Sequence, residues 1–329
     1  MSSINITLSK APSKSGKKSS AAPSSSSSSF NLTLEPSTTL EKLYKEASIK
    51  TRRDVNRLKI TTADKKVAID NDPRKTVASL DLKDGDALHW KDLGPQISWK
   101  LVFLLEYFGP LFIHPLFFHY GHQLIYQHLP KSYASTAPFA HSKMQILAYG
   151  MVMAHYLKRE METLFVHRFS HATMPFFNVF KNCGHYWGLS GLMLAIPLYG
   201  PWYSARALRG SLQGKDEFLY PLVGVFLFAE VSNLVCHLIL RSLRPANDLK
   251  KRQIPTGYGF NKITCPNYFF ESIAWLSFTF LTMSPFSAVF WLIGTLQMVA
   301  WAKKKHRNYK KEFGDKYPKD RWAMIPGIL

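Results

Sequence analysis

Residues 217–244 read EFLYPLVGVFLFAEVSNLVCHLILRSLR, and this run is long and apolar enough to cross a lipid bilayer. A spanning helix needs about 20 mostly apolar residues. A polar stripe interrupts the end of the run at helical spacing: Asn233, His237, Arg241 and Arg244. The segment therefore predicts a membrane helix with one polar face.

About six runs of similar length follow Gly94, at approximately 97–119, 144–166, 184–203, 217–240, 268–283 and 286–302. The last two are short, and only Ser284-Pro285 separates them, so we expect a helical hairpin there. Residues 95–329 are therefore predicted to form an all-α polytopic membrane domain of six or seven helices, with a basic tail over 303–329.

Averages over the whole chain conceal this division. The protein has 329 residues, of which 46% are apolar, and a mean hydropathy of −0.11, as an ordinary soluble protein might have. Residues 1–94, however, carry 17 Lys and Arg against 11 Asp and Glu, whereas nearly all the aromatic residues follow Gly94 in long apolar runs. The distribution excludes a purely soluble protein.

The cysteines and the N-terminus argue against two further classes of protein, those held by disulfides and those with a cleaved signal peptide. Cys183, Cys236 and Cys265 have neither CxxC nor metal-ligand spacing, so we expect no disulfide framework and no metal site. The polar, Ser-rich N-terminus has no apolar core of the kind that signal peptides contain, so no cleaved signal peptide is expected.

Much of the positive charge behind the net charge of +20 lies in loops and in the C-terminal tail, where basic residues set membrane orientation. With the N-terminal residues in the cytosol, the cytosolic loops 167–183 and 241–267 carry two and six Lys and Arg, and the tail from residue 303 carries nine. The loops on the other side carry fewer, which fits the positive-inside rule with both termini cytosolic. We therefore expect a lipid bilayer, and no nucleic acid, as the partner of these charges.

Residues 1–94 are predicted to form a separate α+β domain. Ile4–Leu8 and Phe30–Leu34 alternate as strands. The Lys- and Ser-rich tract 10–29 between them has too little apolar surface to fold, so we expect a disordered insertion. Thr38-Thr39-Leu40-Glu41 is a capping-box pattern that opens a helix.

Further strands are expected at Leu58–Thr62 and Lys66–Ile69, followed by a turn at Asp84-Gly85. The order of hairpin, helix and strands resembles the ubiquitin-like β-grasp fold. The chain continues past Gly94, so no free diglycine tail is available for conjugation. A docking or regulatory module and a plain folded cap both remain open as its use.

Ionisable residues inside membrane segments are costly and usually functional. Glu106 lies in the middle of the first segment, and the second segment ends in a charged cluster. Within that cluster Glu162 lies one helical turn from both Arg159 and Lys158 and can pair with either. Alternatively the helix ends here and the cluster lies among lipid headgroups, which suits Glu106 less because it lies deeper.

The polar stripe suits an anionic ligand that runs along the helix, with the guanidinium groups of Arg241 and Arg244 on phosphates at the cytosolic end. A purely structural account makes both arginines topology anchors. That account leaves Asn233 and His237 on the same face unexplained, so we favour the ligand.

The start of the fifth segment carries a second polar group. Asn267, Tyr268 and Glu271 lie at the membrane mouth, where they can contact a cofactor, although Tyr268 alone also suits an interfacial aromatic. The Gly-rich loop Ile254–Phe260 is not GxGxxG and follows no strand, so a Rossmann fingerprint is absent.

Several of these motifs occur together in one family. They are His155-Tyr156-Leu157-Lys158-Arg159-Glu160, Phe165-Val166-His167-Arg168-Phe169-Ser170, the Asn233–Arg244 stripe, Cys265-Pro266-Asn267-Tyr268 through Glu271, and Phe313-Gly314-Asp315-Lys316-Tyr317-Pro318. In these motifs the chain resembles the steroid 5α-reductase superfamily. With its ubiquitin-like N-terminal domain it looks like the very-long-chain trans-2-enoyl-CoA reductase branch, over almost the whole chain apart from 10–29.

This resemblance implies an integral endoplasmic-reticulum oxidoreductase that uses NADPH to reduce the 2,3 double bond of a long-chain trans-2-enoyl-CoA. The reaction would be the last of the fatty acid elongation cycle, with other elongation enzymes as partners. The family's NADPH-binding positions fall on Asn233, His237, Arg241, Arg244, Asn267, Glu271, His306, Arg307 and Tyr309. The steroid branch has an acidic residue at the position of His237, which is a departure.

The resemblance also implies catalytic positions. Glu106 and Tyr156 match residues that hold the enone carbonyl in the steroid branch, whereas Lys158 and Tyr268 match polar positions of the enoyl-CoA branch. Reduction needs donors for the thioester oxygen and a proton for Cα, so Tyr268 or Tyr156 is the expected proton donor. Lys158 is expected to tune that acid or to meet a CoA phosphate. Glu106 is expected to anchor Tyr156 by a hydrogen bond.

Two functions of other kinds stay open. A steroid or polyprenol reductase of the same superfamily fits the membrane motifs but not the N-terminal domain. A non-catalytic membrane adaptor that recruits a partner through that domain leaves the Asn233–Arg244 stripe without a purpose.

Overall fold

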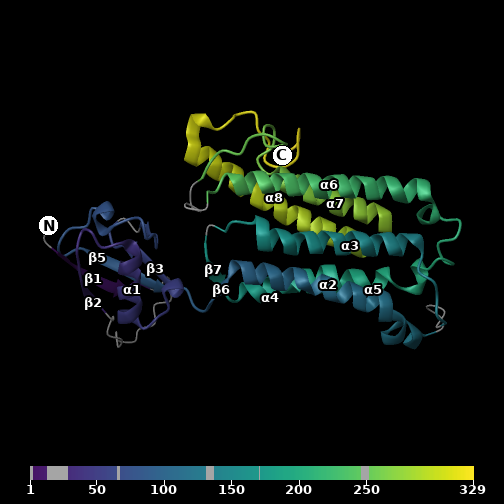
Figure 1. Ribbon diagram of the computed structural model, residues 1–329, viewed down its shortest axis with the longest axis horizontal. Coiled ribbons are helices and arrows are strands. Elements are labelled where there is room, and N and C mark those ends of the chain that lie inside the picture. Colours follow the sequence, from purple (N-terminus) through teal and green to yellow (C-terminus); the bar gives the residue numbers. More distant parts are fainter. Residues whose placement is uncertain (1–2, 13–28, 65–66, 131–136, 170, 246–251) are drawn as a thin grey trace, which may run out of the picture. The chain divides into compact units, whose positions relative to one another are not determined.

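The computed structural model describes residues 3–12, 29–64, 67–130, 137–169, 171–245 and 252–329 (Figure 1). Most of the predicted insertion 10–29 lies outside these residues. The chain divides into two compact units, Met1–Ser98 with Ala172–Phe176 and Trp99–His171 with Phe177–Leu329. Each unit has its own apolar core, so each is described by itself.

The N-terminal unit is built on a five-stranded sheet in the order β2-β1-β5-β3-β4. Its strands are β1 (Ile4–Lys10), β2 (Phe30–Leu34), β3 (Leu58–Thr62), β4 (Ala68–Ile69) and β5 (Ala87–Asp92). β1 and β5 are parallel, and the other neighbours pair antiparallel. The strands expected from period-two alternation are present, but the one expected at Lys66–Ile69 is limited to Ala68–Ile69 among the described residues.

One helix, α1 (Leu40–Thr51), covers this sheet with its apolar face. The helix is present as expected, but its cap is Thr39, which accepts a hydrogen bond from the Lys42 N–H, one residue later than the capping box Thr38–Glu41 predicts. Leu43 and Ala47 are fully buried in one core with Ile60 of β3. A further two-stranded pair, β6 (Gln96–Ser98) with β7 (Thr173–Pro175), belongs to the same unit.

The second unit is helical. Its elements are α2 (Trp99–Leu124), α3 (Lys143–Met161), α4 (Asn178–Cys183), α5 (Leu194–Leu198), α6 (Asp216–Ser242), α7 (Pro266–Thr282) and α8 (Pro285–Phe313). A π-helical turn, Glu162–Val166, extends α3, and a π-helical stretch, Gly184–Met193, joins α4 to α5. The segments predicted from apolar runs are therefore helical, and the expected hairpin is α7 and α8.

Within the described residues, three helical stretches are long and apolar enough to cross a membrane: Trp99–His128, Asp216–Ser242 and Pro285–Lys316. The other predicted spans differ for identifiable reasons. α3 carries Lys158, Arg159 and Glu160 in its last turns, and α7 has 17 residues. The chain is therefore a membrane protein with at least these three candidate spans.

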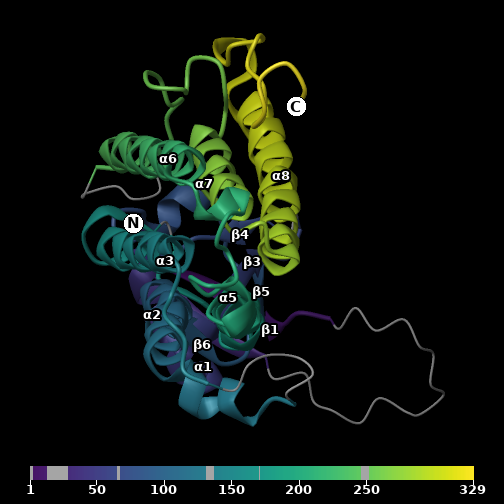
Figure 2. The same cartoon turned by 90° about the vertical axis from the view of Figure 1, so that its right-hand side faces the viewer.

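The long helices of this unit lie side by side in both views, with α2 against α3 and α7 between α6 and α8 (Figures 1 and 2). One apolar core runs through α2, α3, α6 and α7 and includes Tyr107, Val152, Phe226 and Phe278. This packing brings the ends of α3, α6 and α8 and the start of α7 to one end of the bundle.

Candidate functional site

A cavity of about 450 Å³ opens where these helix ends meet. Its wall is made by Val166–Phe169 after α3, by His237, Leu240, Arg241, Leu243 and Arg244 at the end of α6, by Asn267 and Tyr268 at the start of α7, and by Trp301, Lys304, Lys305, Asn308 and Tyr309 of α8. Phe103, Arg159, Arg252 and Gln253 complete it. The cavity is therefore formed by segments far apart in the sequence.

The wall is strongly cationic. It carries seven basic side chains: Arg159, Arg168, Arg241, Arg244, Arg252, Lys304 and Lys305. No Asp or Glu lies among its described lining residues. Such a concentration of guanidinium and ammonium groups suits a ligand with several phosphates.

Two of these arginines also hold the mouth of the cavity together. Arg168 and Arg244 each donate a hydrogen bond to the main-chain carbonyl of the other, which ties the loop after α3 to the end of α6. Burial lowers the pKa of the Arg244 guanidinium, and the nearby Arg252 acts in the same direction. A guanidinium still keeps its charge at pH 7 because its ordinary pKa is above 12.

Six of the predicted site residues line the cavity: His237, Arg241, Arg244, Asn267, Tyr268 and Tyr309. The others do not: Glu106, Tyr156, Lys158, Asn233, Glu271, His306 and Arg307. The wall residues of α8 are Trp301, Lys304, Lys305, Asn308 and Tyr309. His306 instead bonds Thr264 at 2.6 Å, and Arg307 is exposed.

The sequence analysis missed the α8 residues Lys304, Lys305 and Asn308, because it treated residues 303–329 as a tail. In the structure α8 continues to Phe313, so these residues repeat on one helical face with Tyr309. The signal was therefore present as helical spacing beyond the apolar run. Arg168 was quoted in a motif but assigned no role.

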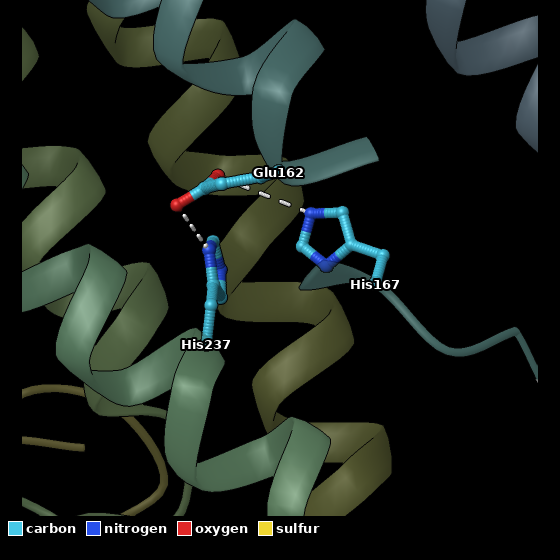
Figure 3. A group of neighbouring side chains, drawn as sticks. All are labelled: Glu162, His167 and His237. Carbon is cyan, nitrogen blue, oxygen red and sulfur yellow. Dashed lines mark ion pairs between the residues drawn. The ribbon is translucent and has the colours of Figure 1, made fainter. Parts of the chain in front are cut away.

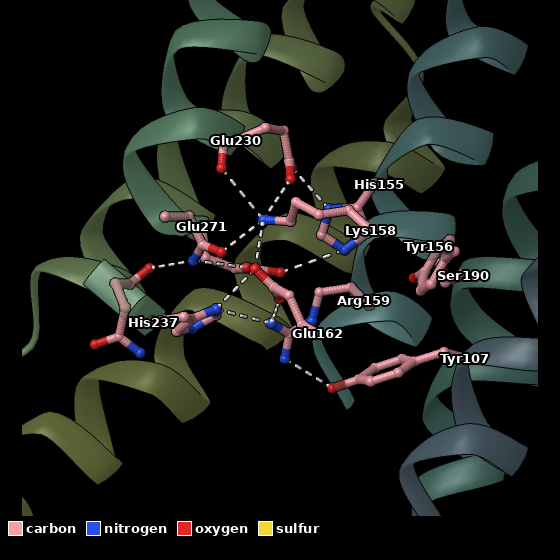
Figure 4. A network of polar contacts seen from close by, with 12 residues as sticks. Tyr107, His155, Tyr156, Lys158, Arg159, Glu162, Ser190, Glu230, His237 and Glu271 are labelled. Carbon is pink, nitrogen blue, oxygen red and sulfur yellow. Dashed lines mark hydrogen bonds and ion pairs between the residues drawn. The ribbon is translucent and has the colours of Figure 1, made fainter. Parts of the chain in front are cut away.

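Beneath the cavity, five polar side chains from α3, α6 and α7 close a ring of contacts (Figure 4). His155 Nδ1 lies 2.7 Å from Glu230 Oε1, and Lys158 Nζ lies 2.8 Å from Glu230 Oε2. Lys158 Nζ donates to Asn233 Oδ1 at 2.6 Å, and Asn233 Nδ2 donates to Glu271 Oε2 at 3.1 Å. Glu271 Oε1 closes the ring 3.4 Å from His155 Nε2.

Next to this ring, Glu162 takes up both pairings that the sequence left open. Its carboxylate lies 2.6 Å from Arg159 Nη1 and 3.6 Å from Lys158 Nζ. Arg159 also donates to the Tyr107 hydroxyl at 2.8 Å (Figure 4). The charged cluster of α3 is therefore held inside the bundle.

The two candidate tyrosines differ in their surroundings. Tyr156 is fully buried, and its hydroxyl lies against Ser190 Oγ, 2.5 Å away (Figure 4). The partner of Tyr156 is thus Ser190, where a hydrogen bond from Glu106 was expected; Glu106 is buried, with one carboxylate oxygen unpaired. Tyr268 is partly exposed and lines the cavity beside Trp301.

Glu162, His167 and His237 have ligand atoms within 4.8 Å of one another and form a candidate metal-binding group (Figure 3). Glu162 lies 3.0 Å from His237 Nδ1 and 3.9 Å from His167 Nε2. The Arg159 guanidinium already neutralises this carboxylate and would repel a divalent cation. The group therefore fits an ion-pair cluster rather than a metal centre.

Comparison with known proteins identifies the family of the chain. A family profile described as 3-oxo-5-alpha-steroid 4-dehydrogenase matches residues 172–329. A Schizosaccharomyces pombe protein whose name describes an enoyl reductase is 47% identical over 88% of this chain and 91% of its own length. The very-long-chain enoyl-CoA reductase of Dictyostelium discoideum is 41% identical over 89% of this chain and 93% of its own. The chain belongs to the very-long-chain enoyl-CoA reductase family.

The resemblance predicted from the motifs is thereby confirmed. A more distant relative, a trans-2,3-enoyl-CoA reductase-like protein of Mus musculus, is 33% identical over 77% of this reductase and 68% of its own length. The segment that the steroid profile matches contains the cavity residues of α6, α7 and α8. Phe103, Arg159 and Val166–Phe169 of the reductase complete the wall from outside that segment.

Proposed function

We propose that this protein is a membrane oxidoreductase that uses NADPH to reduce the 2,3 double bond of a long-chain trans-2-enoyl-CoA, the last step of the fatty acid elongation cycle. Family membership supports the enoyl-CoA substrate. The cationic cavity is the single structural observation that carries the proposal, because both NADPH and an acyl-CoA bring several phosphates to it.

The cavity residues fit a nicotinamide dinucleotide phosphate. Arg241 and Arg244 of α6 lie on the same wall as Lys304 and Lys305 of α8, and all four suit phosphate oxygens. Asn267 Oδ1 is buried without a hydrogen-bond partner, so it suits an amide N–H donor of a bound ligand. When bound, NADPH supplies the hydride for Cβ of the substrate.

Tyr268 is the proton donor that the geometry favours. Its side chain lines the cavity, whereas Tyr156 is sealed in the core against Ser190. Lys305 lines the same cavity as Tyr268 and would stabilise the phenolate that remains after the proton has moved to Cα. Tyr156 and Glu106 then serve the packing beneath the site rather than the proton transfer.

The acyl chain requires an apolar surface, which the membrane helices offer. Leu292, Leu296 and Trp301 of α8 and Leu105 and Phe108 of α2 are exposed in the isolated chain. Acyl groups in the bilayer can approach this surface, while the CoA phosphates remain at the cationic end. The reaction site then lies at the membrane interface.

We further propose that residues 1–94 form a ubiquitin-like β-grasp domain and that six or seven helices cross the endoplasmic-reticulum membrane with both termini cytosolic. The parallel pairing of β1 and β5 at the sheet centre, with α1 as its cover, supports the β-grasp assignment. The charge difference between loops supports the orientation. Other elongation enzymes are proposed as partners.

The test is oxidation of NADPH by detergent-purified protein given a C16–C20 trans-2-enoyl-CoA, with Tyr268→Phe and Tyr156→Phe in parallel. The proposal expects turnover by the wild type, a loss of about 10²-fold or more in Tyr268→Phe with NADPH binding intact, and a smaller loss in Tyr156→Phe. Turnover with a steroid or polyprenol enone and none with enoyl-CoA would contradict it, and would agree with the description of the steroid family profile.

A further inference from the structure

Glu230 is a buried carboxylate on α6 that has no assigned role. It is 7% exposed and does not line the cavity. Its Oε1 is hydrogen-bonded with His155 Nδ1 at 2.7 Å, and its Oε2 forms an ion pair with Lys158 Nζ at 2.8 Å that lacks hydrogen-bond geometry. A buried carboxylate is costly unless it is paired, so these contacts define its surroundings.

Lys158 is turned away from the cavity toward this ring. An ammonium has three N–H donors. It is surrounded by the Glu230 carboxylate, the Glu230 main-chain carbonyl at 3.3 Å, Asn233 Oδ1 at 2.6 Å and the more distant Glu162 carboxylate at 3.6 Å. Lys158 therefore acts on the site through its neighbours rather than by touching a ligand in the cavity.

The contact with Lys158 fixes the side-chain amide of Asn233. Because Asn233 Oδ1 accepts from the ammonium, the Nδ2 group must point the other way. It donates to the main-chain carbonyl of Asn267 at 2.9 Å and to Glu271 Oε2 at 3.1 Å. An amide flip would place Nδ2 against the ammonium and Oδ1 against both acceptors, so the ammonium and the two acceptors together select one orientation.

The Asn267 carbonyl belongs to the turn that carries the site. α7 begins at Pro266, and its N-cap residue, Cys265, makes no side-chain capping bond. The bond from Asn233 reaches a carbonyl of this turn and none of its free N–H groups, so it ties the turn to α6 without capping it. Asn267 and Tyr268 of this turn both line the cavity.

We propose that Glu230 is a positioning residue: through Lys158 and Asn233 it holds the first turn of α7, and thereby the Tyr268 hydroxyl, in the place that proton transfer requires. This inference rests on the proposed function of Tyr268. The charge of Glu230 is essential to it, because without that charge Lys158 shifts toward Glu162, which already holds Arg159 and His237. Asn233 Oδ1 then loses its ammonium partner, and the amide that bonds the α7 turn is held only through Nδ2.

The test is Glu230→Gln in the full-length protein, compared with Glu217→Gln. Glutamine at position 230 keeps the shape of the side chain and a carbonyl oxygen for His155 but removes the charge. The matched control makes the same change in the exposed first turn of α6, whereas Glu230 lies in the middle of that helix. We expect kcat with enoyl-CoA to fall about 10²-fold in Glu230→Gln, with NADPH binding and both KM values nearly unchanged, and no loss in Glu217→Gln.

The decisive measurement repeats Glu230→Gln in the Tyr268→Phe background. If Glu230 acts by placing the Tyr268 hydroxyl, the substitution has little further effect on kcat once that hydroxyl is absent. Equal losses in both backgrounds, or wild-type kcat in Glu230→Gln, would overturn the proposal. If Glu230→Gln does not fold, as judged by detergent gel filtration, Lys158→Met removes the other charge of the same ion pair. Its effect on kcat is then compared in the wild-type and Tyr268→Phe backgrounds in the same way.

If the proposed role of Tyr268 as proton donor is itself wrong, the same variants give a different result. If Tyr268→Phe alone retains wild-type turnover, Tyr268 is not the acid, and the positioning role proposed for Glu230 falls with it. If Tyr268→Phe is slow and Glu230→Gln slows it further by the same factor as in the wild type, the acid stands and only the role of Glu230 is wrong.

Discussion

The guanidinium group of Arg244 contributes both to the fold and to the cavity. It lines the cavity and also bonds the main chain of Arg168. Of the four stripe residues, Asn233 turns into the ring, whereas His237, Arg241 and Arg244 reach the cavity. A helical stripe predicts which residues share a face, but not where along that face a packed core gives way to a cavity.

Arg244→Ala should therefore raise the KM for NADPH about tenfold to a hundredfold, as expected for the loss of charge-assisted hydrogen bonds. The KM for enoyl-CoA should change much less. Steady-state kinetics with each substrate varied in turn measures both, and Arg206→Ala, on the exposed loop before α6, is the control. Equal increases in the two KM values would remove the assignment of Arg244 to the cofactor.

Asp92 is a carboxylate of the N-terminal unit whose pKa depends on its folded contacts. It accepts hydrogen bonds from Arg57 and lies 2.9 Å from Arg53 Nε, so the pKa of its carboxyl is lowered, chiefly by the bond from Arg57. A lowered pKa in the folded state adds stability above the unfolded value of about 3.9, and this stability is lost as the pH falls through the folded pKa.

Asp92→Asn should accordingly destabilise this unit at pH 7, with the difference from the wild type closing as the pH falls below about 4. Hydrogen exchange of the β3 and β5 amides in the full chain reports the effect. Asp81→Asn, at an exposed carboxylate after Leu80, should show no such closing difference. A difference that stayed constant from pH 7 to pH 3 would rule out the Arg57 contact as its source.

Where α2 crosses the helical stretch Gly184–Met193, the packing leaves no room for a side chain at Gly109. A Cβ added at Gly109 would lie 2.2 Å from Trp187 Cδ1, and the Trp187 Nε1 donates to the Leu105 carbonyl at 2.8 Å. The indole therefore lies over α2 only because position 109 has no side chain.

Gly109→Ala should displace this indole and lower the free energy of unfolding by about 1–3 kcal/mol, as overpacking does. Gly150→Ala in α3 is the matched control, because an added Cβ there meets nothing within 4 Å and alanine favours a helix. Thermal unfolding in detergent compares the two. A Gly109→Ala protein as stable as Gly150→Ala would show that the indole moves without cost.

The helices themselves could be predicted from apolar runs, and the details that make the site could not. The sequence analysis ended the sixth segment at residue 302 because the apolar pattern ends there, yet α8 continues through the basic residues to Phe313. Family positions carried over by motif therefore included His306 and Arg307, which the helical phase turns away from the cavity. Likewise Glu230 passed as part of an apolar run, since its partners His155 and Lys158 lie some 75 residues earlier.

Over the whole molecule, the charge distribution supports the proposed orientation of the chain in the membrane. The loops 167–183 and 241–267 and the tail from residue 303 carry most of the Lys and Arg after Gly94, and the cavity formed by these segments should face the cytosol, where NADPH is available.

Epitope tags at both termini should therefore be accessible to antibody or protease in sealed endoplasmic-reticulum vesicles whose cytosolic face is outward, whereas a tag in loop 204–215 should become accessible only after the membrane is permeabilised. Accessibility of the loop tag in sealed vesicles would show an even number of spans before that loop and would contradict the proposed topology.

The central claim is that the protein moves a hydride from NADPH to Cβ of an enoyl-CoA and a proton to Cα. Mass spectrometry of the acyl-CoA formed from NADPH deuterated at the transferring position tests this most directly. We expect a saturated acyl-CoA with one deuterium at C3, and, in deuterated water with ordinary NADPH, one at C2. An unreduced substrate, or a saturated product without label from the cofactor, would contradict it.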